Sequence, residues 1–97
     1  MKTYSYKGKK VCLTTSTYAN NGTLAVMMTS TKGEYLDTIT VNLNDMMQCE
    51  SMAYLDENNM PGIGKWIEKN GLGVPMYVTG RSGFCSYPLY TLFVPEA

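Results

Sequence analysis

The first half of the chain is a series of short runs in which apolar and polar positions alternate, separated by turn sequences. Alternation with a period of two is typical of β-strands that bury one face. The runs cover residues 3–6, 10–17, 23–29 and 34–43. The turns between them are Lys7-Gly8-Lys9, Asn20-Asn21-Gly22 and Thr31-Lys32-Gly33, and Asn-Gly is a dipeptide that tight hairpins favour. We therefore predict consecutive hairpins that build an antiparallel sheet.

One helix is predicted in the second half, over residues 61–70. Its apolar stripe has the spacing i, i+3, i+4 of a buried helical face and consists of Ile63, Trp66 and Ile67. Pro61 suits the first helical position, with Asn59 or Met60 as the preceding cap. Gly71 is suited to end the helix in the left-handed conformation.

The remaining apolar runs, at residues 51–55, 74–79 and 87–94, predict further strands. Residues 42–47 indicate either a loop or a single helical turn, because Asn and Asp favour turns and caps. The predicted fold class is therefore α+β: an antiparallel meander sheet of about five to seven strands with one helix packed on it. We expect residues 1–97 to form a single domain.

Composition agrees with a globular protein, since 44% of the residues are hydrophobic and 16% are charged. Eight Lys and Arg balance eight Asp and Glu. This balance disfavours a nucleic-acid partner, which usually requires a basic surplus. No apolar run reaches the length of a membrane span or a signal peptide. Three widely spaced cysteines fit no disulfide framework, so we expect free thiols and a cytoplasmic location.

Histidine is absent from the chain. Because histidine is the usual general base near neutral pH and the commonest metal ligand, we expect neither an enzyme nor a metal site or other cofactor. A nucleophilic Cys85 would lack its normal base, although the neighbouring Arg81 is able to lower a thiol pKa. The acidic tract at residues 56–59 lacks calcium-loop spacing, and we interpret it as a solvated turn leading into the helix cap.

Residues 80–90 combine the single arginine of the chain with glycines, a proline and clustered aromatic residues. One interpretation is a hairpin loop that covers the edge of the core. The other is a recognition loop, in which Arg81 binds a carboxylate or phosphate and the aromatic side chains form a platform. The candidate binding residues are Arg81, Phe84, Tyr87 and Tyr90. Both interpretations require the same residue types.

The function that these observations favour is a non-catalytic module that binds a protein or peptide. Eight tyrosines and eight methionines also make self-association plausible, because both residue types are enriched in interface cores or adaptable surfaces. The alternative is a barrel-like protein that binds single-stranded nucleic acid by aromatic stacking. Its stacking residues would be Tyr4, Tyr6, Tyr18 and Tyr35, and its cations Lys7, Lys9, Lys10 and Arg81.

Four segments together resemble a family of small proteins of similar length, catalogued as a domain of unknown function. They are Tyr18-Ala19-Asn20-Asn21-Gly22, Thr40-Val41-Asn42-Leu43, Asp56-Glu57-Asn58-Asn59-Met60-Pro61 and Ser82-Gly83-Phe84-Cys85-Ser86-Tyr87-Pro88-Leu89-Tyr90. The last segment is the most specific. The resemblance implies an accessory protein encoded in gut bacteria, often on conjugative or phage-like mobile elements. It carries no catalytic residue to this chain.

Overall fold

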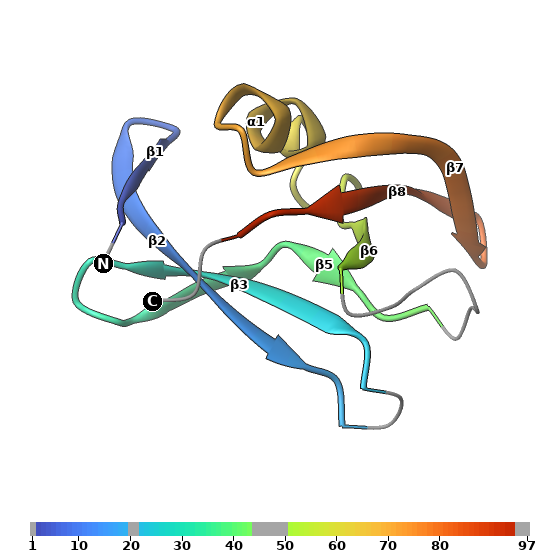
Figure 1. The fold of residues 1–97 in the computed structure, drawn as a ribbon, viewed down its shortest axis with the longest axis horizontal. Coiled ribbons are helices and arrows are strands. Elements are labelled where there is room, and N and C mark those ends of the chain that lie inside the picture. Colours follow the sequence, from blue (N-terminus) through green and yellow to red (C-terminus); the bar gives the residue numbers. More distant parts are fainter. Residues whose placement is uncertain (1, 20–21, 44–50, 95–97) are drawn as a thin grey trace.

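The computed structural model describes residues 2–19, 22–43 and 51–94, which contain eight strands and one helix (Figure 1). The elements are β1 (Tyr4–Tyr6), β2 (Lys9–Thr17), β3 (Leu24–Ser30), β4 (Tyr35–Thr38), β5 (Thr40–Val41), β6 (Met52–Leu55), α1 (Ile63–Lys69), β7 (Gly73–Ser82) and β8 (Cys85–Leu92). They form two four-stranded antiparallel sheets, ordered β1-β2-β3-β4 and β5-β6-β8-β7. The predicted class is confirmed. The strands are, however, divided between two sheets instead of following one meander.

The first sheet follows the predicted hairpins. Lys7 and Gly8 form a two-residue turn between β1 and β2, with φ angles of 49° and 80°. Positive φ at both central positions is the geometry of a type I′ turn, whose twist matches that of the strands. The predicted Asn20-Asn21-Gly22 turn lies partly outside the described residues, as does most of segment 42–47.

The run 34–43, which alternation assigns to one strand, crosses from one sheet to the other at Ile39. The Ile39 amide donates to the Val26 carbonyl, and the Ile39 carbonyl accepts from the Asp56 amide, each at 2.8 Å. Its side chain is completely buried. The prediction of one continuous strand is therefore wrong here. Alternation looks the same whether a strand stays in its sheet or bends into a second one.

The helix begins later than predicted. Gly62, with φ 88°, is the N-cap of α1, and neither Asn59 nor Met60 caps it. Instead, the Glu57 carboxylate accepts hydrogen bonds from the amides of Gly62 at 2.9 Å and Gly64 at 2.6 Å. A carboxylate at this end also interacts favourably with the helix dipole. The acidic tract is thus the turn that leads into the helix, with its glutamate serving as the cap.

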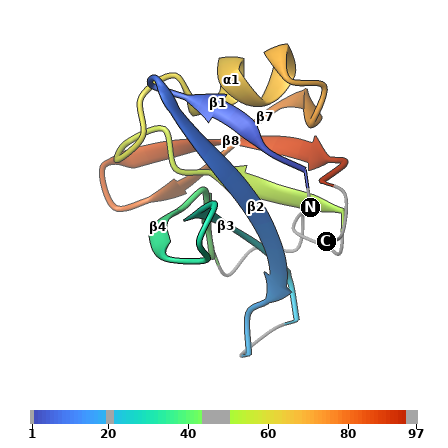
Figure 2. The same ribbon diagram turned by 90° about the vertical axis from the view of Figure 1, so that its left-hand side faces the viewer.

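At its other end α1 terminates as the sequence predicts, with Gly71 in the left-handed region at φ 68°. Ile63 and Ile67 are buried, whereas Trp66 is half-buried and contacts β1. The Trp66 indole packs edge-on against Tyr4 and Tyr6, and its N–H donates to the Ser5 carbonyl at 2.7 Å. Figure 2 shows α1 and β1 on the same side of the second sheet.

Two hydrophobic clusters lie on opposite faces of the second sheet. The larger cluster joins both sheets and the helix, and includes Val26, Ile39, Leu55, Ile63, Ile67, Tyr90 and Leu92. The smaller cluster contains Leu43, Tyr54, Tyr87 and Leu89. We call the β8 face of Ser86, Pro88, Tyr90 and Leu92 the helix-side face, and the alternate one the outer face. Among the described residues, no helix has the length and apolar character that crossing a membrane requires.

Candidate functional site

The block that the sequence singles out is the distal part of the β7–β8 hairpin, which Figure 1 shows reaching one end of the molecule. Ser82 pairs with Cys85, so Gly83 and Phe84 form a two-residue turn. Gly83 has φ 61°, whereas Phe84 is not among the residues with positive φ. Positive φ at the first position alone is the pattern of a type II′ turn, which requires glycine there. The turn leaves the Phe84 side chain fully exposed.

The four candidate binding residues are not brought together. Arg81 lies in β7 opposite Ser86, on the helix-side face, and is exposed like Phe84. Tyr87 and Tyr90 are only 9% and 6% exposed, and they belong to different clusters on opposite faces of the sheet. Their aromatic rings fill the interior, so a surface platform of four residues does not form. Arg81 and Phe84 are the two that a partner can reach.

Tyr90 has a structural role beside the helix. Its hydroxyl donates to Oε2 of Glu68 at 2.7 Å. Burial raises the pKa of the Tyr90 hydroxyl most, and the hydrogen bond to Glu68 raises it further. The charges of Glu68, Glu57 and Tyr77 act in the same direction. The tyrosine thus anchors β8 to α1 in its protonated form.

Tyr87 faces the smaller cluster, next to Cys85. Burial raises the pKa of the Tyr87 hydroxyl, and the side-chain hydrogen bond with Cys85 adds to the effect, followed by the charges of Cys85 and Asp56. Cys85 is a half-buried free thiol and Cys12 a buried one, while Cys49 lies outside the described residues. In the described ranges, no three His, Cys, Asp or Glu side chains are grouped so that they could hold a metal ion.

Tyr77 is an exposed residue that no local sequence pattern marks. The β7–β8 register shifts between Pro75 and Thr79, which marks a β-bulge or irregularity. Within it, Tyr77 has φ 60° and is 92% exposed. A bulky side chain in the left-handed region costs roughly 1–2 kcal/mol, and such strain is concentrated at functional sites. The run 74–79 contains no signal for the bulge beyond Pro75, which cannot donate to a strand ladder.

The basic residues of the nucleic-acid alternative lie on two separated hairpins. Lys7, Lys9 and Lys10 belong to the β1–β2 hairpin, whereas Arg81 lies near the tip of β7–β8, and these hairpins occupy opposite ends of the molecule in Figure 1. Of the four tyrosines, Tyr4 is buried, Tyr6 and Tyr18 are half-buried, and Tyr35 is 62% exposed. This arrangement does not favour stacking along one basic surface.

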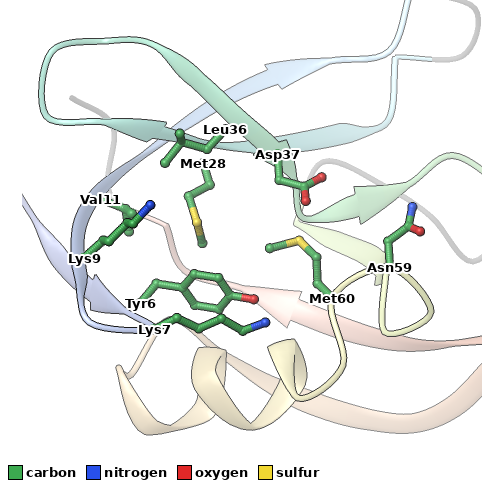
Figure 3. Close-up of a pocket in the computed structure, with 9 residues that line it drawn as sticks. All are labelled: Tyr6, Lys7, Lys9, Val11, Met28, Leu36, Asp37, Asn59 and Met60. Atoms are coloured by element: carbon green, nitrogen blue, oxygen red, sulfur yellow. The ribbon is translucent and has the colours of Figure 1, made fainter.

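A pocket of about 300 Å³ opens between the β1–β2 hairpin, the β3–β4 hairpin and the loop that precedes α1 (Figure 3). We call it the methionine pocket, and its lining residues are Tyr6, Lys7, Lys9, Val11, Met28, Leu36, Asp37, Asn59 and Met60. Figure 3 shows the Met28 and Met60 side chains extending toward one another at its centre. No local sequence pattern indicates this pocket, because its walls come from three separate segments of the chain.

Comparison with known families places the chain. A family described as a domain of unknown function, DUF4313, matches residues 12–95. The chain belongs to this family. The match includes β7 and β8 with their turn, and therefore covers Arg81 and Phe84. No curated protein and no solved structure matches the chain.

Proposed function

We propose that this DUF4313 protein is a non-catalytic module that binds a protein or peptide through the tip of its β7–β8 hairpin. The observation that carries the proposal is the fully exposed Phe84 in a tight turn, with the exposed Arg81 three residues before it. Burying a phenylalanine side chain contributes about 1.5–3 kcal/mol. Such an aromatic anchor, with an arginine nearby, is the composition that binding hot spots favour.

The short turn supports the same role. A two-residue loop between paired strands fixes the backbone at Phe84 before a partner binds, which lowers the entropic cost of binding. The partner we propose offers an apolar pocket for Phe84 and a carboxylate for Arg81, whose planar guanidinium suits bidentate pairing.

Binding through side chains fits β7 better than the addition of a partner strand. β7 is an edge strand, and exposed edges are able to pair with a strand of another chain. Pro75 removes one backbone donor, and the register shift up to Thr79 interrupts the ladder. These features discourage continuous strand pairing.

The proposal also includes a cellular setting. The family resemblance supports an accessory protein of a mobile element in gut bacteria, and the free thiols of Cys12 and Cys85 support a cytoplasmic location. In that setting the partner is a second bacterial protein, with a second copy of this chain as the alternative.

A photo-crosslinking experiment tests the proposal. Phe84 is replaced by benzoylphenylalanine, which keeps an aromatic side chain at the exposed tip, and the full-length protein is irradiated in its native host. Tyr35, an exposed aromatic residue of β4, receives the same replacement as the control. We expect a discrete adduct from position 84 that position 35 does not give, and a weaker one when Arg81→Ala is added. Identical adducts from both positions would rule out the hairpin tip, and an adduct of doubled mass would identify self-association.

A further inference from the structure

We propose that the methionine pocket is a second binding site, separate from the hairpin tip, and that it takes a small carboxylate with an aromatic body. The pocket is about 300 Å³. This is the lower end of the size range of small-molecule sites, and it corresponds to roughly ten water-sized groups.

The floor of the pocket sets the preference for an aromatic body. Val11, Met28 and Met60 are buried, and the half-buried Tyr6 adds an aromatic side chain to the lining. Methionine sulfur forms favourable contacts with aromatic rings, and its flexible side chain adapts to the shape of a ligand. Because Met28 and Met60 both extend into the centre of the pocket in Figure 3, an aromatic ligand there contacts their side chains.

The rim sets the charge. Lys7 and Lys9 lie on the β1–β2 side, whereas Asp37 lies on the β4 side, so the lining carries one more positive than negative charge. The Lys7 amine is 5.5 Å from the centroid of the Tyr6 ring, which holds it at the edge of the apolar floor. Asp37 is already engaged, since its Oδ1 accepts from the Thr38 amide at 2.9 Å. An anionic group is therefore favoured at the lysine side.

Two backbone irregularities place these rim and floor residues. Lys7 occupies the left-handed region at φ 49°, a conformation that is uncommon for lysine. The β3–β4 register shifts between Met28 and Thr29, directly beside the pocket. Bulges are frequent next to binding sites because they re-aim a side chain.

The single tryptophan of the chain provides the measurement. Trp66 packs edge-on against Tyr6 with the ring centroids 5.3 Å apart, so a ligand that contacts Tyr6 changes the surroundings of the indole. Full-length protein is titrated with 3-phenylpropanoate, 3-phenylpropanol and 3-phenylpropylamine, which share one aromatic body and differ in charge. Trp66 fluorescence is followed, and calorimetry verifies each titration. We expect saturable binding, with the highest affinity for the carboxylate, a lower affinity for the alcohol and the lowest for the amine.

Matched variants connect the binding to this pocket. Lys9→Gln removes a rim charge, whereas Lys10→Gln removes an exposed neighbouring charge outside the lining. We expect Lys9→Gln to weaken carboxylate binding about fivefold and Lys10→Gln less than about twofold, as partly exposed charge pairs allow. At the exposed rim position Leu36, Leu36→Lys should strengthen binding and Leu36→Glu should weaken it, each by about threefold.

Three results of these titrations would contradict the proposal. The proposal is overturned if the carboxylate shows no saturable binding, if the alcohol or amine binds as tightly, or if Lys9→Gln and Lys10→Gln have the same effect. All four variants alter exposed side chains, so their thermal unfolding should stay close to that of the parent protein. None of these results depends on Phe84, so an experiment that contradicts binding at the hairpin tip would not contradict binding in the methionine pocket.

Discussion

The β7–β8 hairpin has a half that packs beside the helix and a half that extends beyond it, and the two halves differ on their helix-side face. In the proximal half, Gly73 lies close to Ile67 of the helix, and Tyr90 is hydrogen-bonded to Glu68. In the distal half, Thr79, Arg81 and Ser86 point to solvent on the same face. The difference arises because α1 has only seven residues and cannot cover a ten-residue strand. On the helix-side face, packing against α1 is thus confined to the proximal half, and the exposed side chains lie in the distal half.

The largest expected effect comes from comparing two glycines of the β7–β8 hairpin, one in the proximal half and one at the turn of the distal half. A Cβ at Gly73 would lie 2.6 Å from the Thr91 carbonyl oxygen and 2.9 Å from the Leu92 side chain, and the backbone cannot move away cheaply. Gly73→Ala should lower the free energy of unfolding by about 3 kcal/mol. Gly83→Ala has open space around it and strains only φ, so it should cost about 1 kcal/mol. Urea denaturation of both variants measures this, and equal losses would contradict the contrast between the halves.

The next effect concerns the helix that covers the proximal half. Glu57→Ala removes the carboxylate that accepts from the Gly62 and Gly64 amides, and should lower the free energy of unfolding by about 1–2 kcal/mol. The control, Glu34→Ala, alters an exposed carboxylate in the β3–β4 turn and should change stability by less than about 0.5 kcal/mol. If thermal denaturation shows the same loss for both, Glu57 is not the cap of α1.

Tyr90→Phe removes the hydrogen bond from the Tyr90 hydroxyl of β8 to Glu68 of α1. It should lower the free energy of unfolding by about 1 kcal/mol at neutral pH. The folded pKa of Tyr90 is raised above the ordinary value of 10.0, so its contribution is fully present below that pH. As the pH rises above it, the unfolded chain ionises first and the contribution declines. Denaturation at pH values from neutral to alkaline should therefore show a steeper decline for the parent protein than for Tyr90→Phe. Parallel declines would mean that Tyr90 does not set this pH dependence.

The smallest effect lies at the junction of the two halves. Tyr77→Asn places at φ 60° a residue that tolerates the left-handed region, and it loses little packing because the ring is 92% exposed. The free energy of unfolding should rise by about 0.5–1 kcal/mol. Val78→Asn, at the next position and without positive φ, is the control and should not stabilise the protein. A loss of stability in Tyr77→Asn would show that the ring is needed for packing.

Local patterns were sufficient for most of the elements. The period-two runs and glycine turns correspond to β1, β2 and β3, and the i, i+3, i+4 spacing corresponds to α1. Features that depend on distant parts of the chain could not be predicted. Ile39 lies between the two sheets because Thr38 before it pairs with β3 and Thr40 after it pairs with β6. Glu57 caps a helix that starts six residues later.

The position of the candidate site could be predicted from the sequence, but the exposure of its individual side chains could not. The residue types of segment 80–90 predict either a hairpin loop or a recognition loop, and of the four candidate residues Arg81 and Phe84 are exposed. Tyr87 and Tyr90 are not, because β8 is the strand between β6 and β7 and is covered on both faces in its middle. A run that is covered on both sides has no alternation from which exposure can be inferred.

The short, glycine-containing helix also has a consequence for how the protein folds. The seven residues of α1, with Gly64 in the first turn and Gly62 as the N-cap, are too few to form a stable helix alone. The contacts that hold α1 arrive from elsewhere, since the Trp66 indole reaches the Ser5 carbonyl across 61 positions. We therefore expect helix formation to follow strand pairing, and mutations in α1 to accelerate unfolding more than they slow folding. The fluorescence of Trp66 would then report the last step of folding, when the chain closes over its larger cluster.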